Sequence, residues 1–324
     1  MLTTRVKRAS FLLAILVIPV WLSYPIFADT QAPSAAQTPG DSENPFVLIK
    51  NFKGTPIDFN LEICAFKLYD APGAEIDVYY EIPNRQLAFK PLVSDEFATS
   101  LVVAVRILDK DGKILKETAS RGSTRVKTEK ETKDPALSGN FISSFNLEPG
   151  DYVFKVGVCD NVSGAVGVKE RKFSVKSLPE GELGISSVLF SSDVRKAESE
   201  DDPARVKGDW VVTSNPTRTY RIGDTLSVYF NIYNLKLDNA GKPRFKVSYV
   251  FKREGQRRMW RDVVKGERKK GENQGHLYSN DLLAKFKGTD KDKFKPGKYT
   301  LFIKVTDELG NKAVEAKEAF TILE

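Results

Sequence analysis

His276 is the only histidine in this sequence of 324 residues, so any mechanism that needs an imidazole would have to use it. A Ser-His-Asp or Cys-His arrangement depends on one imidazole, and zinc sites built from several are excluded by the count. His276 lies in Gly-Glu-Asn-Gln-Gly-His-Leu-Tyr-Ser-Asn, a polar segment with turn character. We therefore predict a solvated loop histidine without a catalytic role.

Two acidic clusters are the other places where chemistry is conceivable. Asp109-Lys-Asp-Gly112 begins like a calcium loop, but the third ligand position and the closing Glu are missing, and Asp-Gly between two strands is an ordinary hairpin turn. The acids of 198–202 precede Pro203 and predict a disordered surface loop, with a divalent-ion site as the alternative. We predict no catalytic residue, no metal site and no cofactor.

Cys64 and Cys159 are the only cysteines, an even count that permits one disulfide in an exported chain. Their bridge would close a loop of about 95 residues and contribute about 4 to 5 kcal/mol in the chain-entropy model. Cys159 is out of phase with the apolar positions of its strand, so the bridge would join strand edges. The alternative is two separate, half-buried thiols.

Positive charge is concentrated in the second half of the chain. Residues 242–270 hold 12 basic and 3 acidic residues, a net charge of +9 within a chain of net charge +7. The pattern predicts a hairpin with Gly255 in its turn. Arginine pairs with phosphate or carboxylate, and tryptophan stacks on rings, so this stretch is a candidate site for an anionic polymer or partner. The candidate residues are Arg257, Arg258, Trp260, Arg261, Lys265, Arg268, Lys269 and Lys270.

The alternative is that this basic hairpin is simply a solvated edge. Lysine and arginine keep an edge strand from pairing with neighbouring molecules, and Trp260 would then belong to the core. If a partner exists, an envelope protein or an anionic polymer fits an exported chain. Nucleic acid is a poor candidate, because export removes the usual encounter, and a membrane becomes a partner only if the N-terminal segment is retained.

The elements that would position these residues are predicted by a stretch that occurs twice. Residues 149–175 and 296–322 correspond at a constant offset of 147, each with Pro-Gly before a strand-starting tyrosine. Apolar residues alternate along both copies, as in half-buried antiparallel strands. Tyr152 and Tyr299 are predicted to be tyrosine corners, in which the phenol hydroxyl bonds to upstream backbone.

The repeat extends toward the N-terminus. Residues 76–82 resemble 226–232, and the strand predicted over 101–108 corresponds to 245–251. Units of this length indicate duplicated domains and not a stacked array. We predict an all-β fold with two tandem immunoglobulin- or fibronectin-III-like β-sandwiches, over 46–178 and 184–324.

The N-terminus has the features of a secretory signal. Residues 1–28 contain a basic start, an apolar run and Ala28 as a small residue before cleavage. The apolar span is about long enough to cross a bilayer if it is retained as an anchor. Residues 29–45 hold three prolines and no aromatic residue, so we predict a flexible linker. The chain is expected in the periplasm or outside the cell.

The segments IDVYYEIPNRQLAF, RTYRIGDTLSVYFNIYNL and KPGKYTLFIKVTDELGNKAV resemble the β-sandwich regions of bacterial secreted proteins that carry the GWxTD module. The likeness covers most of 60–324. The GWxTD motif itself is absent, and Gly208-Asp209-Trp210 is its nearest approach. The resemblance therefore implies a fold and export, and implies little about activity.

These observations predict a non-catalytic exported binding or scaffold protein of the bacterial envelope. The first alternative is an accessory module that positions an exported enzyme. The second is a hydrolase with an unrecognised acidic pair, which no sequence feature marks.

Overall fold

The computed structural model describes residues 44–48, 54–68, 71–257, 259–266, 273–281 and 294–324, and only the backbone along 260–266 and 273–281. The predicted signal segment 1–28 and almost all of the predicted linker lie outside these residues. Among the described residues, no helix has the length and the apolar character that crossing a bilayer would require. Ala36–Glu324 form one compact unit.

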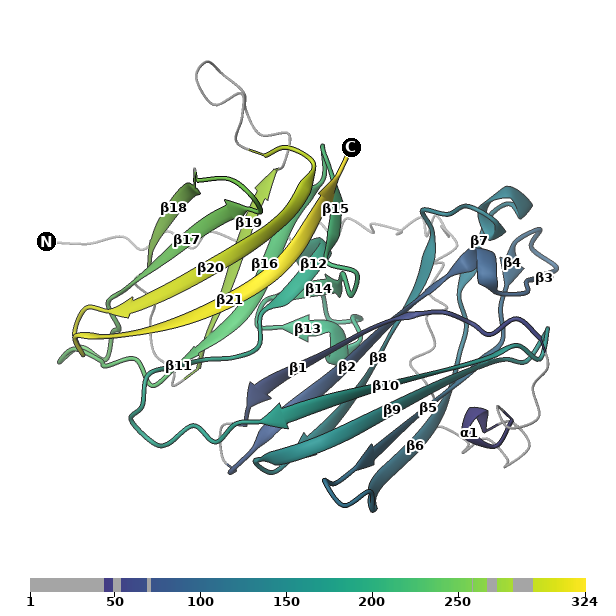
Figure 1. The fold of residues 1–324 in the computed structure, drawn as a ribbon, viewed down its shortest axis with the longest axis horizontal. Helices are drawn as coiled ribbons and strands as arrows, with labels where there is room; N and C mark the ends of the chain where they lie inside the picture. The colour runs from purple at the N-terminus through teal and green to yellow at the C-terminus, as the bar shows by residue number, and fades with distance from the viewer. Residues whose placement is uncertain (1–43, 49–53, 69–70, 258, 267–272, 282–293) are drawn as a thin grey trace, which may run out of the picture. The chain divides into compact units, whose positions relative to one another are not determined.

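The described chain is built almost entirely of strands, which confirms the all-β prediction (Figure 1). Residues 60–175 form two facing sheets, which we call the N-terminal sandwich. One sheet has the order β1-β2-β8 and the other has the order β10-β9-β5-β6. The strands are β1 (Asn60–Lys67), β2 (Ala74–Pro83), β5 (Leu101–Leu108), β6 (Ile114–Gly122), β8 (Ser138–Leu147), β9 (Gly150–Asp160) and β10 (Val166–Val175).

Residues 184–323 form a second pair of sheets, the C-terminal sandwich. One sheet has the order β11-β16-β12-β14-β13 with β19 also paired to β16, and the other has the order β15-β21-β20-β17-β18. Its strands are β11 (Gly184–Ile185), β12 (Leu189–Lys196), β13 (Val206–Lys207), β14 (Trp210–Ser214), β15 (Thr219–Arg221), β16 (Thr225–Tyr233), β17 (Phe245–Arg253), β18 (Met259–Gly266), β19 (Asn273–Asp281), β20 (Gly297–Asp307) and β21 (Lys312–Leu323).

Short elements complete the described chain. A small sheet joins β3 (Lys90–Pro91), β4 (Phe97–Ala98) and β7 (Arg125–Val126). The single-turn helix α1 (Pro45–Leu48) precedes β1, and three 3-10 turns are η2 (Asn84–Gln86), η3 (Glu129–Thr132) and η4 (Pro203–Arg205).

Each sandwich encloses its own apolar core, because alternate residues of its central strands turn toward the facing sheet. In the N-terminal sandwich, Val78 of β2 and Val105 of β5 belong to one buried cluster. In the C-terminal sandwich, Val228 of β16 and Tyr249 of β17 belong to another. The two clusters share no residue.

The C-terminal hairpins β9–β10 and β20–β21 confirm the predicted repeat. β9 and β20 have the same length and start and end at the predicted offset of 147 residues. The Tyr152 hydroxyl donates to the Glu148 carbonyl at 2.9 Å, and the Tyr299 hydroxyl donates to the Lys295 carbonyl at 2.7 Å. Both predicted tyrosine corners are therefore present.

The helix α1 corrects the predicted end of the linker. The sequence predicts that Pro45 ends the linker, but Pro45 begins α1 and is buried against the outer face of β9. Asn44 caps this turn by accepting a hydrogen bond from the Phe46 N–H at 3.0 Å. Gly157 allows this approach, because a Cβ atom there would lie 2.8 Å from the Pro45 ring.

Candidate functional site

Three buried charged side chains lie where the outer face of β1 and β2 meets the sheet of β12, β14 and β16, those of Glu62, Asp77 and Lys207. Cys64, Phe66 and Tyr79 of the N-terminal sandwich form one apolar cluster with Leu189, Val212 and Tyr229 of the C-terminal sandwich. We call this region the sandwich contact. The other face of β1 packs on the core of the N-terminal sandwich, so β1 is buried on both faces.

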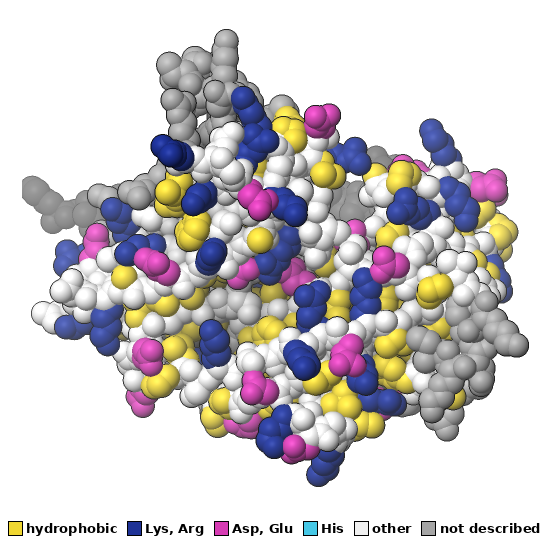
Figure 2. Space-filling view, in the orientation of Figure 1, with side chains coloured by type: hydrophobic (Ala, Val, Ile, Leu, Met, Phe, Trp, Pro, Cys, Tyr) yellow, Lys and Arg dark blue, Asp and Glu magenta, His cyan; other side chains and the backbone are white. Residues whose placement is uncertain are grey.

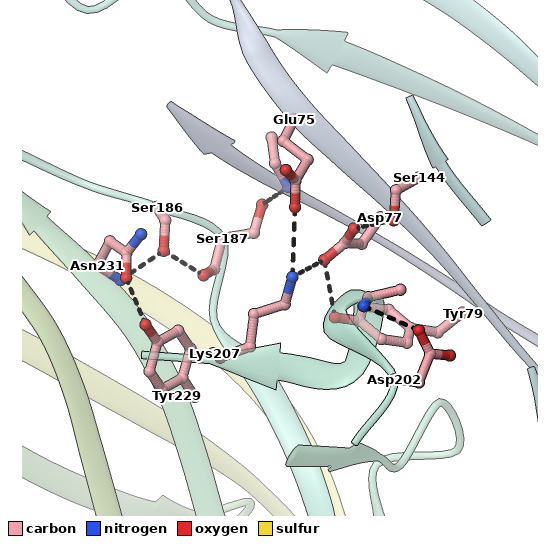
Figure 3. A network of polar contacts seen from close by, with 12 residues as sticks. Glu75, Asp77, Tyr79, Ser144, Ser186, Ser187, Asp202, Lys207, Tyr229 and Asn231 are labelled. Atoms are coloured by element: carbon pink, nitrogen blue, oxygen red, sulfur yellow. Dashed lines mark hydrogen bonds and ion pairs between the residues drawn. The ribbon is translucent and has the colours of Figure 1, made fainter. Parts of the chain in front are cut away.

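Lys207 of β13 makes the first ion pair of the sandwich contact. Its Nζ lies 2.7 Å from Asp77 Oδ2 and 3.4 Å from Glu75 Oε1 (Figure 3). The Tyr79 hydroxyl donates to Asp77 Oδ2 at 2.9 Å, and the Ser144 hydroxyl donates to Asp77 Oδ1 at 2.7 Å. The Asp77 side chain is fully buried, and these three donors replace the water it has lost.

Arg218 makes the second ion network from the turn before β15. Its guanidinium lies 2.8 Å from Glu62 Oε1 of β1 and also pairs with Glu318 of β21. Burial raises the pKa of Glu62 to about 7, although Arg218 acts in the opposite direction. Burial lowers the pKa of Arg218, but the two carboxylates raise it by more, so the guanidinium stays charged.

The free edge of β1 is capped by the C-terminal sandwich. β1 pairs only with β2, which leaves backbone N–H groups on its other side. The Ala65 N–H donates to the Ser187 hydroxyl at 2.9 Å, and the Lys67 N–H donates to the Tyr233 hydroxyl at 2.8 Å. Side chains of the C-terminal sandwich thus accept hydrogen bonds from the edge strand β1. Without them, these backbone N–H groups could pair with a strand of another chain.

The sandwich contact is built to hold charges in place. Burial raises the pKa of the Cys64 thiol, with Glu62 adding to the rise, so the thiolate needed for nucleophilic attack does not form at neutral pH. A cavity of about 10 Å³ lies beside Tyr79, Arg205 and Ser214, with room for about one water molecule. The arrangement joins the two sandwiches.

The predicted disulfide is wrong. Cys64 lies in the sandwich contact on β1, whereas Cys159 lies on β9 of the facing sheet, in a cluster with Val102 and Val166. Both point away from the core between the two sheets, so their thiols are on opposite outer faces. The expected half-burial is also wrong: Cys64 is covered by the C-terminal sandwich, and Leu48 of α1 packs against the Cys159 cluster.

The predicted basic hairpin is present as β17 and β18, with Gly255 in its turn at a φ of 74°. β18 is an edge strand, as the solvated-edge alternative expects. Arg257 is exposed next to the turn. The register pairs Trp260 with Phe251, Arg261 with Val250 and Lys265 with Lys246. Arg258, Arg268, Lys269 and Lys270 lie outside the described residues.

Two other predictions need correction. His276 belongs to β19, opposite Phe230 of β16, and not to a loop. Polar residues there still pair as a strand, because a continuous antiparallel ladder with β16 satisfies the backbone. The acidic segment 198–202 is an ordered turn, since Asp201 pairs with Arg195 and accepts the Glu198 N–H at 2.8 Å. Asp109 accepts two backbone N–H groups in the predicted hairpin turn.

A second hollow of about 550 Å³ opens in the C-terminal sandwich where β12 bulges between Ser191 and Asp193. Its lining is polar and includes Asp193, Asn215 and Asp224. Asp224 is already engaged, because its carboxylate accepts the Arg221 N–H at 2.6 Å. Sequence reasoning missed both this hollow and the sandwich contact, because their residues come from distant strands without a local motif.

No family model and no curated protein matches this chain. Solved structures with partial similarity include the transglutaminase of red sea bream, at 10% identity and a TM-score of 0.23, covering 88% of this chain and 34% of that one. A β-glucuronidase of Bacteroides uniformis has 11% identity and a TM-score of 0.27, covering 78% of this chain and 26% of that one. This chain therefore spans about a third or less of those proteins.

Proposed function

We propose that this chain is an exported, non-catalytic binding or scaffold protein of the bacterial envelope. In this proposal the sandwich contact braces one sandwich against the other, and the basic hairpin 242–270 meets an anionic partner. The resemblance to the sandwich regions of GWxTD-module proteins, and the signal segment read from residues 1–28, support the expectation of export.

The observation that carries the proposal is the pairing of buried charges at the sandwich contact. Asp77 and Glu62 are buried carboxylates, and each is met by a cation from the other sandwich, Lys207 or Arg218. Removing Lys207 would leave the buried Asp77 charge without its cation, which costs about 3 to 5 kcal/mol. A chain that holds its sandwiches in this way suits a bracing role.

The test is retention of the mature chain on envelope material from the same source at low and high ionic strength. We expect the Arg257→Ala/Arg261→Ala double variant to lose retention while its melting temperature is unchanged, because Arg257 is exposed and Arg261 lies opposite Val250 on the outward side of the sheet. Retention of the wild-type chain should fall at about 1 M salt, where the Debye length is about 3 Å.

The matched control changes exposed cations elsewhere. Lys127→Ala/Lys130→Ala alters two exposed lysines of the N-terminal sandwich and should retain envelope material like wild type. Equal retention by the hairpin variant and wild type would contradict the proposal. Capture of an exported enzyme that keeps its activity would favour the accessory role instead.

A further inference from the structure

The outer face of the sheet that contains the basic hairpin is itself basic. Along β17, β20 and β21, one set of alternate residues enters the core and the other set points outward. Lys and Arg side chains lie over these strands in the space-filling view (Figure 2). The outward lysines are Lys246, Lys252, Lys298, Lys304 and Lys317, and we call this surface the lysine face.

The register spreads these lysines over the sheet. Lys252 lies opposite Thr300, and Lys317 lies opposite Phe302, whose other neighbour is Val250. Outward residues that lie opposite one another on β17, β20 and β21 form rows across the sheet. Successive rows are two residues apart along a strand, about 6.7 Å, so five rows cover about 27 Å. Each row carries one lysine, and the lysines alternate among three strands. The charge is therefore distributed in two dimensions and not along one line.

Few acids offset this charge. Glu315 is the one acid among the described outward residues of β17, β20 and β21, and it pairs with Lys304 at 3.0 Å. Phe302 lies half-buried in the middle, with the Lys317 ammonium 5.7 Å from its ring centre. The edges add exposed apolar side chains, with Met259 58% exposed and Leu323 45% exposed. The surface thus combines separate cations with apolar side chains in its middle and at its edges.

We propose that the lysine face docks on a lipid bilayer that carries anionic headgroups. A sheet face with cations spread in two dimensions complements the extended negative surface of a bilayer, whereas a single polymer chain would be met by cations in a groove or a row. Apolar side chains between the cations can contact the interfacial region of a bilayer. This inference rests on the proposed anionic binding and extends it from the hairpin to the whole face.

The number of lysines removed determines how much vesicle binding should weaken. A basic residue near an anionic leaflet contributes a roughly fivefold gain in partitioning, and the attraction decays within a Debye length. Three lysines removed together should therefore weaken binding about 100-fold. The Lys252→Gln/Lys298→Gln/Lys317→Gln triple variant changes exposed side chains on three strands, so it should melt like wild type.

The experiment is flotation of the mature chain with vesicles of phosphatidylcholine alone or mixed with phosphatidylglycerol. We expect binding to the mixed vesicles only, its loss in the triple variant, and its loss at high salt. The control Lys113→Gln/Lys127→Gln/Lys130→Gln removes the same charge from exposed positions of the N-terminal sandwich and should bind like wild type.

Three results would overturn the inference: no binding to the mixed vesicles, equal binding by the triple variant, or equal loss in the control. Soluble polyglutamate provides a separate arm. If the chain binds polyglutamate through the hairpin but ignores vesicles, the proposed anionic binding stands and the bilayer assignment fails. If the chain binds neither polyglutamate nor vesicles and is also not retained on envelope material, both the proposed anionic binding and the bilayer assignment fail.

Discussion

Buried carboxylates of the sandwich contact and of the hairpin turns pair with cations or accept backbone hydrogen bonds, and these contacts replace those that water would otherwise make. Glu62 and Asp77 keep buried carboxylates at the sandwich contact. Asp160 and Asp307, which the repeat aligns, are buried at the ends of β9 and β20 and accept hydrogen bonds from neighbouring loops. These carboxylates have structural roles that their sequence neighbourhoods do not reveal.

The first residue-scale prediction concerns pH. The pKa of Glu62 rises from 4.5 in a model peptide to about 7 in the folded chain. Between these values the folded state keeps a proton that the unfolded state has released, so stability falls as pH rises from about 4.5 to about 7. Glu62→Gln removes this titration. Its stability relative to wild type should rise by about 3 kcal/mol between pH 4.5 and 8, measured by denaturant unfolding.

Glu117 provides the control for this experiment. Its hydrogen bond to Arg106 lowers the pKa of Glu117, so its titration lies below 4.5. Glu117→Gln should therefore follow the wild-type pH profile from pH 5 to 8. The explanation would be wrong if the wild-type and Glu62→Gln profiles ran parallel over that range.

The second residue-scale prediction concerns Asp307, one of the two aspartates that the repeat aligns. The Asp307 carboxylate accepts the N–H groups of Lys236, Leu309 and Gly310 at 2.9 to 3.0 Å. Asp307→Ala leaves these donors without an acceptor and should cost about 3 kcal/mol of unfolding free energy. Asp109→Ala, at a half-buried position beside the exposed turn 110–113, should cost less, about 1 kcal/mol. Similar costs for both variants would count against the proposed role.

At the scale of elements, the two closing hairpins use the same corner with different numbers of hydrogen bonds. The Tyr299 hydroxyl both donates to the Lys295 carbonyl and accepts the Lys295 N–H at 2.8 Å. The Tyr152 hydroxyl donates to the Glu148 carbonyl. Tyr299 is buried, whereas Tyr152 is half-buried. The corner of β20 is therefore the stronger of the two.

Phenylalanine variants measure this difference. Tyr299→Phe should lower the unfolding free energy by about 2 kcal/mol, and Tyr152→Phe by about 1 kcal/mol, because buried hydrogen bonds cost more to lose. Calorimetric melting temperatures would check the order. Amide exchange should accelerate at Lys295 in the first variant alone. A larger effect at Tyr152 would refute the comparison.

At the scale of the whole molecule, the sandwich contact should make residues 44–324 unfold together. Lys207→Met/Arg218→Met removes both cations, and the loss of the cation beside the buried Asp77 carboxylate alone costs about 3 to 5 kcal/mol. We expect one calorimetric transition in wild type and two in the double variant. Lys155→Met, which removes an exposed pair with Glu170 at 3.1 Å, should keep one transition.

The two buried thiols report where the chain opens. Cys64 is at the sandwich contact, and Cys159 lies in a separate cluster. If the double variant weakens the contact by about 3 kcal/mol, labelling of Cys64 should accelerate about 100-fold, while labelling of Cys159 stays unchanged. Mass spectrometry of the labelled peptides separates the two. Equal acceleration would indicate global unfolding and contradict a local role for the contact.

The sequence by itself determined the all-β fold, the repeated closing hairpins and the tyrosine corners. These depend on alternation with a period of two and on local turns, so neighbouring residues carry the information. The tertiary structure decided which outer faces are covered. Glu62 and Cys64 occupy positions that read as solvent-facing on β1, and only packing against β12, β14 and β16 buries them. The disulfide failed for the same reason, because spacing along the chain does not say which face of which sheet a thiol occupies.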